Sequence, residues 1–183
     1  DRNLLAKMID HTLLKPEATD ADVIALCGEA AELGTFSVCV SPTFVSLAAA
    51  NVSNGVKVAT VCGFPSGKHE AEIKAAEAKL SVSQGAHEVD MVIDVGRAIM
   101  GDWDYLEAEV SAVRKATGNA LLKVILETGE LVTYDNVRKA SYLAMLAGAD
   151  FIKTSTGKVA PAATAPGEIV VNGWSPSKRN NPY

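Results

Sequence analysis

The stretch that decides the fold is Glu88–Val95, whose sequence is EVDMVIDV. Side chains of an extended strand alternate between two faces. One face of this stretch carries Val89, Met91, Ile93 and Val95, and the other carries Glu88, Asp90, Val92 and Asp94. The apolar face predicts a contact with covering helices. The acidic face predicts a surface on which ionisable side chains meet.

The next two expected strands also place charge on one face. Lys123 and Glu127 share a face of Leu121–Glu127, and Lys153 shares a face with Phe151. Charges within a strand suit the inside of a barrel, close to its C-terminal mouth, because an open doubly wound sheet has helices over both faces. We therefore predict an α/β fold of the TIM (β/α)8 type.

Strands and helices alternate along the chain, which predicts a parallel sheet with right-handed crossovers. Earlier strands are expected at Met8–Leu14, Phe36–Val40 and Val56–Val61, and helices after the cap Thr19, from Pro42 to about Asn51, and over Lys68–Gln84, Trp103–Ala116 and Tyr134–Ala147. Only six β/α units are recognisable, whereas an eight-stranded barrel usually takes about 250 residues. The expected barrel is therefore incomplete.

The pattern changes after Lys158. We expect a loop or weak helix start over Val159–Pro166, then a short strand and an Asn-Gly turn within Gly167–Ser175, and a polar, disordered end from Pro176 to Tyr183. This predicts a partial barrel domain over residues 1–166 and an unrelated, flexible tail over residues 167–183.

Composition bounds the function classes. The chain has 183 residues, 48% of them hydrophobic, and a net charge of −5, which suits one soluble domain with no electrostatic footprint for nucleic acid. No apolar run reaches membrane-spanning length and no secretory signal is recognisable, so we expect a cytoplasmic protein without membrane contact. Cys27, Cys39 and Cys62 lack zinc or disulfide spacing and are expected to be reduced and buried.

Two other motifs do not hold. The segment Gly63–His69 resembles a P-loop, but its spacing is one residue short and His69 stands where a magnesium-binding hydroxyl belongs. His11, His69 and His87 are too scattered to form a metal-ligand motif, so we expect them to be structural or exposed. No metal site is predicted.

The lysines suggest chemistry. A lysine within a strand either reaches solvent past the strand end, pairs with a carboxylate, or has a lowered pKa and acts as a nucleophilic amine. Repulsion between Lys123 and Lys153 predicts that one amine is neutral near pH 7, and such an amine attacks carbonyl groups while Asp90 moves a proton. A buried ion-pair network beside an ordinary Ser/Thr-rich turn explains the same pattern.

Six segments together resemble one known family. They are Asp10–Pro16, Val38–Pro42, Gly63–Gly67, Glu88–Ile93, Leu122–Thr128 and Gly148–Lys158. In this order they are similar to deoxyribose-phosphate aldolase, a class I aldolase on a TIM barrel, over about residues 4–166. The resemblance implies reversible cleavage of 2-deoxy-D-ribose 5-phosphate to D-glyceraldehyde 3-phosphate and acetaldehyde in deoxyribonucleotide catabolism, without a metal or other cofactor.

The resemblance also implies residue roles. Lys153 matches the Schiff-base lysine, Asp90 the proton donor and acceptor, and Lys123 a pocket residue near the imine. The positions implied to line the substrate are Asp10 and Cys39, with weaker roles, and Thr156, Gly157 and Lys158 at the phosphate end.

The chain departs from the family after strand six. The family's seventh strand carries G-x-K-x-x-G-G-I-R and its eighth ends in a Gly/Ser phosphate loop, and neither is recognisable here. Open sheet edges favour association, so a homo-oligomer is one expectation. The alternatives to an active aldolase are a catalytically impaired barrel that acts only as an oligomerising or partner-binding fragment, and a barrel aldolase or phosphosugar isomerase with another substrate.

Overall fold

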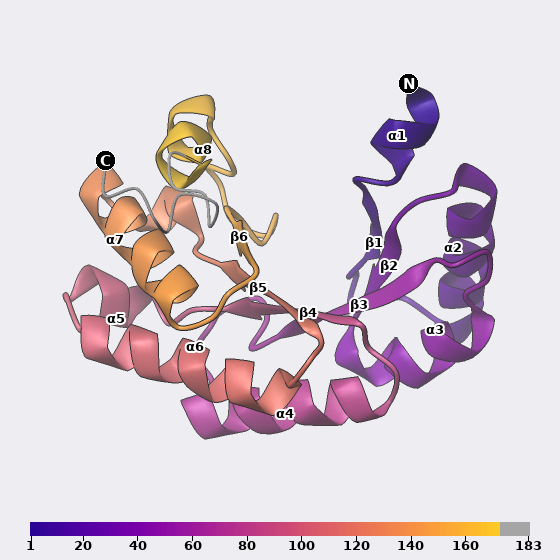
Figure 1. Cartoon of the computed structure of the whole chain (residues 1–183), viewed down its shortest axis with the longest axis horizontal. Coiled ribbons are helices and arrows are strands. Elements are labelled where there is room, and N and C mark those ends of the chain that lie inside the picture. Colours follow the sequence, from indigo (N-terminus) through magenta and orange to yellow (C-terminus); the bar gives the residue numbers. More distant parts are fainter. Residues whose placement is uncertain (173–183) are drawn as a thin grey trace.

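The computed structural model describes residues 1–172, which form one six-stranded parallel sheet in the order β1-β2-β3-β4-β5-β6. The strands are β1 (Asp10–Leu13), β2 (Ser37–Val40), β3 (Lys57–Cys62), β4 (Glu88–Val92), β5 (Leu121–Ile125) and β6 (Phe151–Lys153). Every expected strand up to the sixth is therefore present. The sheet is curved, and β1 and β6 form its two ends (Figure 1).

Most of the helices lie on the outer side of this curved sheet (Figure 1). The helices are α1 (Arg2–Ala6), α2 (Asp20–Leu33), α3 (Val45–Asn51), α4 (Ala71–Ser83), α5 (Val95–Ile99), α6 (Trp103–Thr117), α7 (Tyr134–Leu146) and α8 (Ala165–Asn172), with 3-10 turns η1 (Pro42–Phe44) and η2 (Thr128–Glu130). The predicted incomplete barrel of β/α units is confirmed. Among the described residues no helix is both long enough and apolar enough to cross a membrane.

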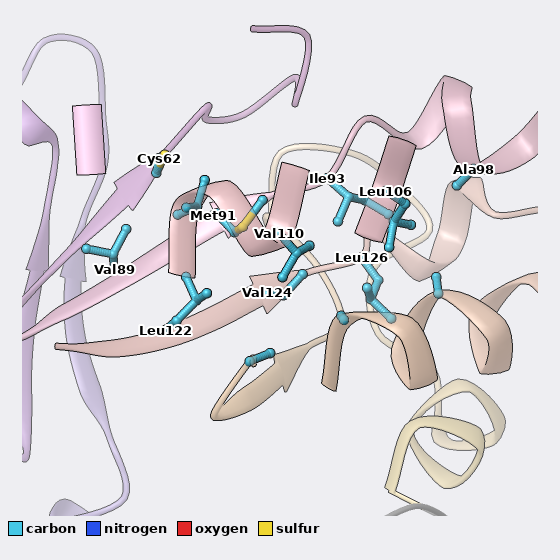
Figure 2. Close-up of a cluster of buried hydrophobic side chains, with 14 of the residues drawn as sticks. Cys62, Val89, Met91, Ile93, Ala98, Leu106, Val110, Leu122, Val124 and Leu126 are labelled. Carbon is cyan, nitrogen blue, oxygen red and sulfur yellow. The ribbon is translucent and has the colours of Figure 1, made fainter. Parts of the chain in front are cut away.

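The alternation predicted for β4 and β5 is what builds the main core. Val89, Met91 and Ile93 pack with Leu122, Val124 and Leu126 against Leu106 and Val110 of α6 (Figure 2). All these side chains are buried. Because this face is filled with apolar groups, the opposite face of the same strands is left for Glu88, Asp90 and Lys123.

Helix starts follow their caps. Thr19 forms a complete capping box with Asp22 at the start of α2, as the sequence predicts. Asp94 accepts a hydrogen bond from the Arg97 N–H and begins α5, so Val95 lies in a helix and not in the expected strand. The Asp94 carboxylate favours a helix start here because it accepts from an N–H that the first helical turn leaves without a backbone partner.

The predicted strand within Gly167–Ser175 is wrong. Helix α8 spans Ala165–Asn172. Val171 is 4% exposed and belongs to the main core, and the partly buried Val170 packs against it. A helix places these adjacent apolar residues against α7 and the core, which the two-sided alternation of a strand does not do. The rest of the expected turn and the expected disordered end lie outside the described residues.

Candidate active site

Two lysines and three carboxylates meet on the inner face of the sheet. They come from three neighbouring strands and from β1, the far end of the sheet: Asp10 from β1, Glu88 and Asp90 from β4, Lys123 from β5 and Lys153 from β6. Parallel pairing sets Asp90 beside Lys123, and Ile125 beside Lys153. The curvature of the sheet then brings β1 and β6 within reach of the same group of side chains.

The closest contact joins Lys153 to Asp90. Lys153 Nζ donates to Asp90 Oδ2 at 2.6 Å. The carboxylate of Asp90 is fully buried, whereas the Lys153 side chain is 35% exposed. The pair therefore combines a buried acid with an amine that a molecule from solvent can reach.

Lys123 lies deeper and is surrounded by acids. Its Nζ lies 2.6 Å from Asp10 Oδ2, 2.5 Å from Glu88 Oε2 and 4.0 Å from Asp90 Oδ1. Its side chain is 12% exposed. Lys123 therefore links the carboxylate of β1 to the two carboxylates of β4.

The surrounding acids keep both lysines charged. Burial alone would lower the pKa of Lys153, but the pairing with Asp90 outweighs it and raises that pKa. Burial would also lower the pKa of Lys123, and the carboxylates of Asp90, Asp10 and Glu88 raise it instead. The expectation that repulsion between Lys123 and Lys153 leaves one of the two amines neutral is wrong for this arrangement, because three carboxylates face two ammonium groups.

The pKa values of the three carboxyl groups shift in different directions. Burial raises the pKa of Asp90 and that of Glu88, even though lysines oppose the shift. Burial also acts to raise the pKa of Asp10, but hydrogen bonds from Lys123 and Ser37 hold it below its usual range. Asp90 is thus an acid that holds a proton more readily than an ordinary aspartate, directly beside the amine of Lys153.

Cys39 also lies at this inner face. It is fully buried, and it packs with Ala59 and Val61. Burial, with a smaller contribution from Asp90, raises the pKa of the Cys39 thiol to about 12. Cys39 therefore contributes a small neutral surface to the site, and all three cysteines are free and buried as predicted.

The loop after β6 carries the remaining candidate residues. The Thr156 N–H and hydroxyl donate to the carboxylate of Glu127, and Lys158 Nζ donates to the Leu14 carbonyl at 3.2 Å. Gly157 has a left-handed φ of 76°. The loop thus connects the C-terminal ends of β5 and β6 to the segment after β1.

A cavity of about 450 Å³ adjoins the lysines. Asp10, Glu88, Lys123 and Lys153 line one part of it, and Lys7 and apolar side chains including Phe151 line the rest. A cavity of about 480 Å³ near η2 and the start of α7 contains none of the candidate residues. The 450 Å³ cavity reaches Lys123 and Lys153 from the side on which the strands begin, and the loop that carries Thr156, Gly157 and Lys158 does not line it.

Sequence reasoning gave no role to two buried acids in this region. Glu88 contacts Lys123, and Glu127 contacts Thr156. The alternation of β4 places Glu88 on the same face as Asp90, and this was a usable signal. Glu127 follows the end of β5, and nothing in the local pattern indicated its partner. Within residues 1–172, no three His, Cys, Asp or Glu side chains form a group that could hold a metal ion.

Residues 4–170 match the family described as DeoC/LacD family aldolase. The chain is 56% identical over 159 residues to deoxyribose-phosphate aldolase of Mycolicibacterium paratuberculosis, an alignment that covers 85% of this chain and 71% of that relative.

Solved structures give the same result. A Coccidioides immitis structure assigned as a deoxyribose-phosphate aldolase has a TM-score of 0.90 and 37% identity, and the match covers 93% of this chain and 68% of that one. A tetrameric deoxyribose phosphate aldolase from Aeropyrum pernix has a TM-score of 0.81 and 30% identity, and the match covers 94% of this chain and 73% of that one.

Proposed function

The chain belongs to the DeoC/LacD aldolase family, and from this premise we propose that it cleaves 2-deoxy-D-ribose 5-phosphate reversibly to D-glyceraldehyde 3-phosphate and acetaldehyde. The observation that carries the proposal is the pair formed by Lys153 and Asp90, whose Nζ and Oδ2 atoms lie 2.6 Å apart. A reachable amine beside a buried acid is what Schiff-base catalysis requires.

The first step is formation of an imine. Lys153 gives up a proton, and its neutral amine attacks C1 of the open-chain aldehyde to form a carbinolamine. The C1 oxygen then leaves as water, and a protonated imine remains. Asp90 is the nearest acceptor for the lysine proton, and its raised pKa makes that transfer less costly than transfer to an ordinary aspartate.

The second step breaks the C2–C3 bond. A base removes the proton of the C3 hydroxyl, C3 becomes the aldehyde carbon of D-glyceraldehyde 3-phosphate, and the bonding electrons pass to C2 to form an enamine. Protonation of C2 and addition of water to the resulting imine release acetaldehyde and restore Lys153. Asp90, directly or through a water, serves as the acid and base near C2.

The other candidate residues have supporting roles. Lys123 stays an ammonium between Asp10 and Asp90 and stabilises the ionised form of Asp90 when its proton is delivered. Cys39 lines the pocket. Gly157 and Lys158, after Thr156, offer an N–H group and a cation for the phosphate.

Turnover is the test of this function. Glyceraldehyde 3-phosphate released from 2-deoxyribose 5-phosphate is measured with a coupled dehydrogenase. The Lys153→Arg variant keeps the positive charge but should lose activity, because a guanidinium does not form the imine. The matched control is Lys115→Arg, which changes an exposed lysine of α6 and should keep the activity. A folded wild type without turnover, or an active Lys153→Arg variant, contradicts the proposal.

Further proposals concern the setting of the enzyme. We propose that it works in the cytoplasm on small phosphosugars and aldehydes, without nucleic acid, and that it forms homo-oligomers. The tetrameric relative from Aeropyrum pernix supports the last point. We also propose that the barrel domain covers residues 1–166 and that a C-terminal segment follows it, with Val170 and Val171 packed on the barrel core. Light scattering after chromatography tests self-association, since a monomeric mass at assay concentration contradicts it.

A further inference from the structure

Glu127 is a buried carboxylate at the C-terminal end of β5. Only 3% of the surface of Glu127 is exposed. Its backbone is left-handed, with φ 53° and ψ 61°. In the described part of the chain it has no ion pair with a lysine or arginine. A non-glycine residue in this conformation and a buried carboxyl group without a cation beside it are both costly, so the surroundings must hold them in place.

The contacts of Glu127 lead into the loop after β6. The Thr156 N–H donates to Oε1 at 3.2 Å and to Oε2 at 3.3 Å. The Thr156 hydroxyl also donates to Oε2, and it accepts a hydrogen bond from the Lys158 N–H at 3.1 Å. Glu127 therefore uses both donors of Thr156 and reaches Lys158 through them.

The backbone on both sides is fastened to β6. The Leu126 N–H donates to the Lys153 carbonyl at 3.0 Å, and the Thr128 N–H donates to the Thr154 carbonyl at 2.8 Å. The loop thus leaves Lys153 with its first residues fixed against β5. The carboxylate of Glu127 continues the same attachment two residues further along, at Thr156.

This geometry changes what the loop offers to an anion. Both donors of Thr156 are directed to Glu127, and the Lys158 N–H is directed to Thr156. The Gly157 N–H makes no hydrogen bond within residues 1–172, and Gly157 and Lys158 are both exposed. The Lys158 ammonium gives one of its three N–H groups to the Leu14 carbonyl. The Gly157 N–H and the remaining N–H groups of that ammonium are therefore left to contact a phosphate.

We infer that Glu127 is a positioning residue that fixes the Thr154–Lys158 loop, so that Gly157 and Lys158, and not Thr156, contact the phosphate of the substrate. The inference rests on the proposed aldolase function. It predicts that Glu127 acts on recognition of the phosphate end and not on the chemistry at Lys153.

Four variants distinguish the effect of the Glu127 carboxylate from the effect of its left-handed backbone. Glu127→Ala removes the carboxylate, and Glu127→Gly removes it while favouring the left-handed backbone. Glu127→Gln keeps an oxygen that accepts from the Thr156 N–H. Glu130→Ala is the matched control, because Glu130 is an exposed acid in the same turn.

Kinetics are measured with 2-deoxyribose 5-phosphate and with 2-deoxyribose. Glu127→Ala and Glu127→Gly should raise the KM for the phosphorylated substrate about tenfold, as expected for loss of hydrogen bonds to a charged group. Their kcat/KM for 2-deoxyribose should stay near that of the wild type. Glu127→Gln should recover most of the loss, and Glu130→Ala should show none. An equal loss on both substrates, or an unchanged KM, overturns the inference.

Calorimetric titration with inorganic phosphate provides a readout that does not depend on turnover. The wild type should bind phosphate, and Glu127→Ala should bind it about tenfold more weakly, in line with the same hydrogen-bond loss. Equal binding by the two proteins, or no binding by the wild type, overturns the inference. Phosphate binding that follows this pattern in a protein without turnover contradicts the proposed aldolase function alone.

Discussion

Breaking the buried ion pair between Lys74 of α4 and Glu109 of α6 should destabilise the fold strongly. Both side chains are fully buried, and Lys74 Nζ lies 2.6 Å from Glu109 Oε2. Lys74 also donates to the Val92 carbonyl at 2.9 Å, and Glu109 Oε1 accepts from the Asp94 N–H at 2.8 Å. The network therefore joins two helices to the end of β4, the strand that carries Asp90.

The magnitude follows from the loss of one partner. Lys74→Met leaves a carboxylate buried without its cation, which costs about 3–5 kcal/mol. For a domain of this size that corresponds to a fall in Tm of about 6–20 °C. The double variant Lys74→Met with Glu109→Gln should recover much of the loss, because it removes both charges and keeps an acceptor for the Asp94 N–H.

An exposed pair near the same strand end provides the control. Lys68 Nζ lies 2.5 Å from Asp94 Oδ1, and the lysine side chain is 57% exposed. Lys68→Met should therefore cost only about 0–1 kcal/mol. Urea unfolding of the wild type, of the single variants Lys74→Met, Glu109→Gln and Lys68→Met, and of the double variant gives the comparison. A Lys74→Met cost near that of Lys68→Met, or a double variant as unstable as the sum of its single changes, would refute the reasoning.

The free energy of unfolding of Lys74→Met should depend on pH in a defined direction. Burial raises the pKa of Glu109 even with Lys74 present. Without the lysine, the folded state should bind a proton at Glu109 more readily than the unfolded state does. The instability of Lys74→Met relative to the wild type should therefore shrink as the pH falls toward the folded pKa of Glu109, and grow as the pH rises.

Three other changes have defined outcomes. Thr19→Ala removes the cap of α2 and should lower the free energy of unfolding by about 1 kcal/mol in urea, whereas Thr19→Ser should not. The Nδ1 atom of His87 accepts a hydrogen bond from the Val58 N–H, and burial lowers the pKa of His87. The free energy of unfolding should therefore fall as the pH drops below about 6.5, the pKa of histidine in the unfolded chain. His87→Asn should remove this part of the pH dependence. Asp90→Asn should lower kcat by about 10²–10⁴ as loss of an acid–base group does, and the pKa of Lys153 should fall because its partner is neutral; an unchanged kcat would contradict the role of Asp90.

The fold was predictable because local patterns and tertiary packing agree. The alternation in β4 separates Val89, Met91 and Ile93 from Glu88 and Asp90, and the structure uses the first set for the core. The helix cap at Thr19 was also readable. α8 was misread because Ile169–Val171 is a short apolar run with no polar residue to distinguish the period of a helix from that of a strand.

The candidate site was predictable in its members but not in its electrostatics. Strand order made the meeting of Asp90, Lys123 and Lys153 on one face predictable, with Asp90 paired beside Lys123 and Lys153 beside Ile125, two residues further along β5. The charge balance depends on Asp10 and Glu88, which approach Lys123 only after the sheet curves. The hydrogen bonds between Glu127 and Thr156 depend on the conformation of the loop after β6, which the spacing of residues in the sequence does not predict.

Trapping of the covalent intermediate tests the central claim most directly. The protein is incubated with acetaldehyde and reduced with borohydride, and the modified residue is located by peptide mapping. The account predicts one added ethyl group on Lys153, with faster labelling as the pH rises, because the Asp90 carboxylate raises the pKa of that amine. A folded sample with no adduct on Lys153, or with the adduct on Lys123 instead, would contradict the assignment of Lys153 as the Schiff-base lysine.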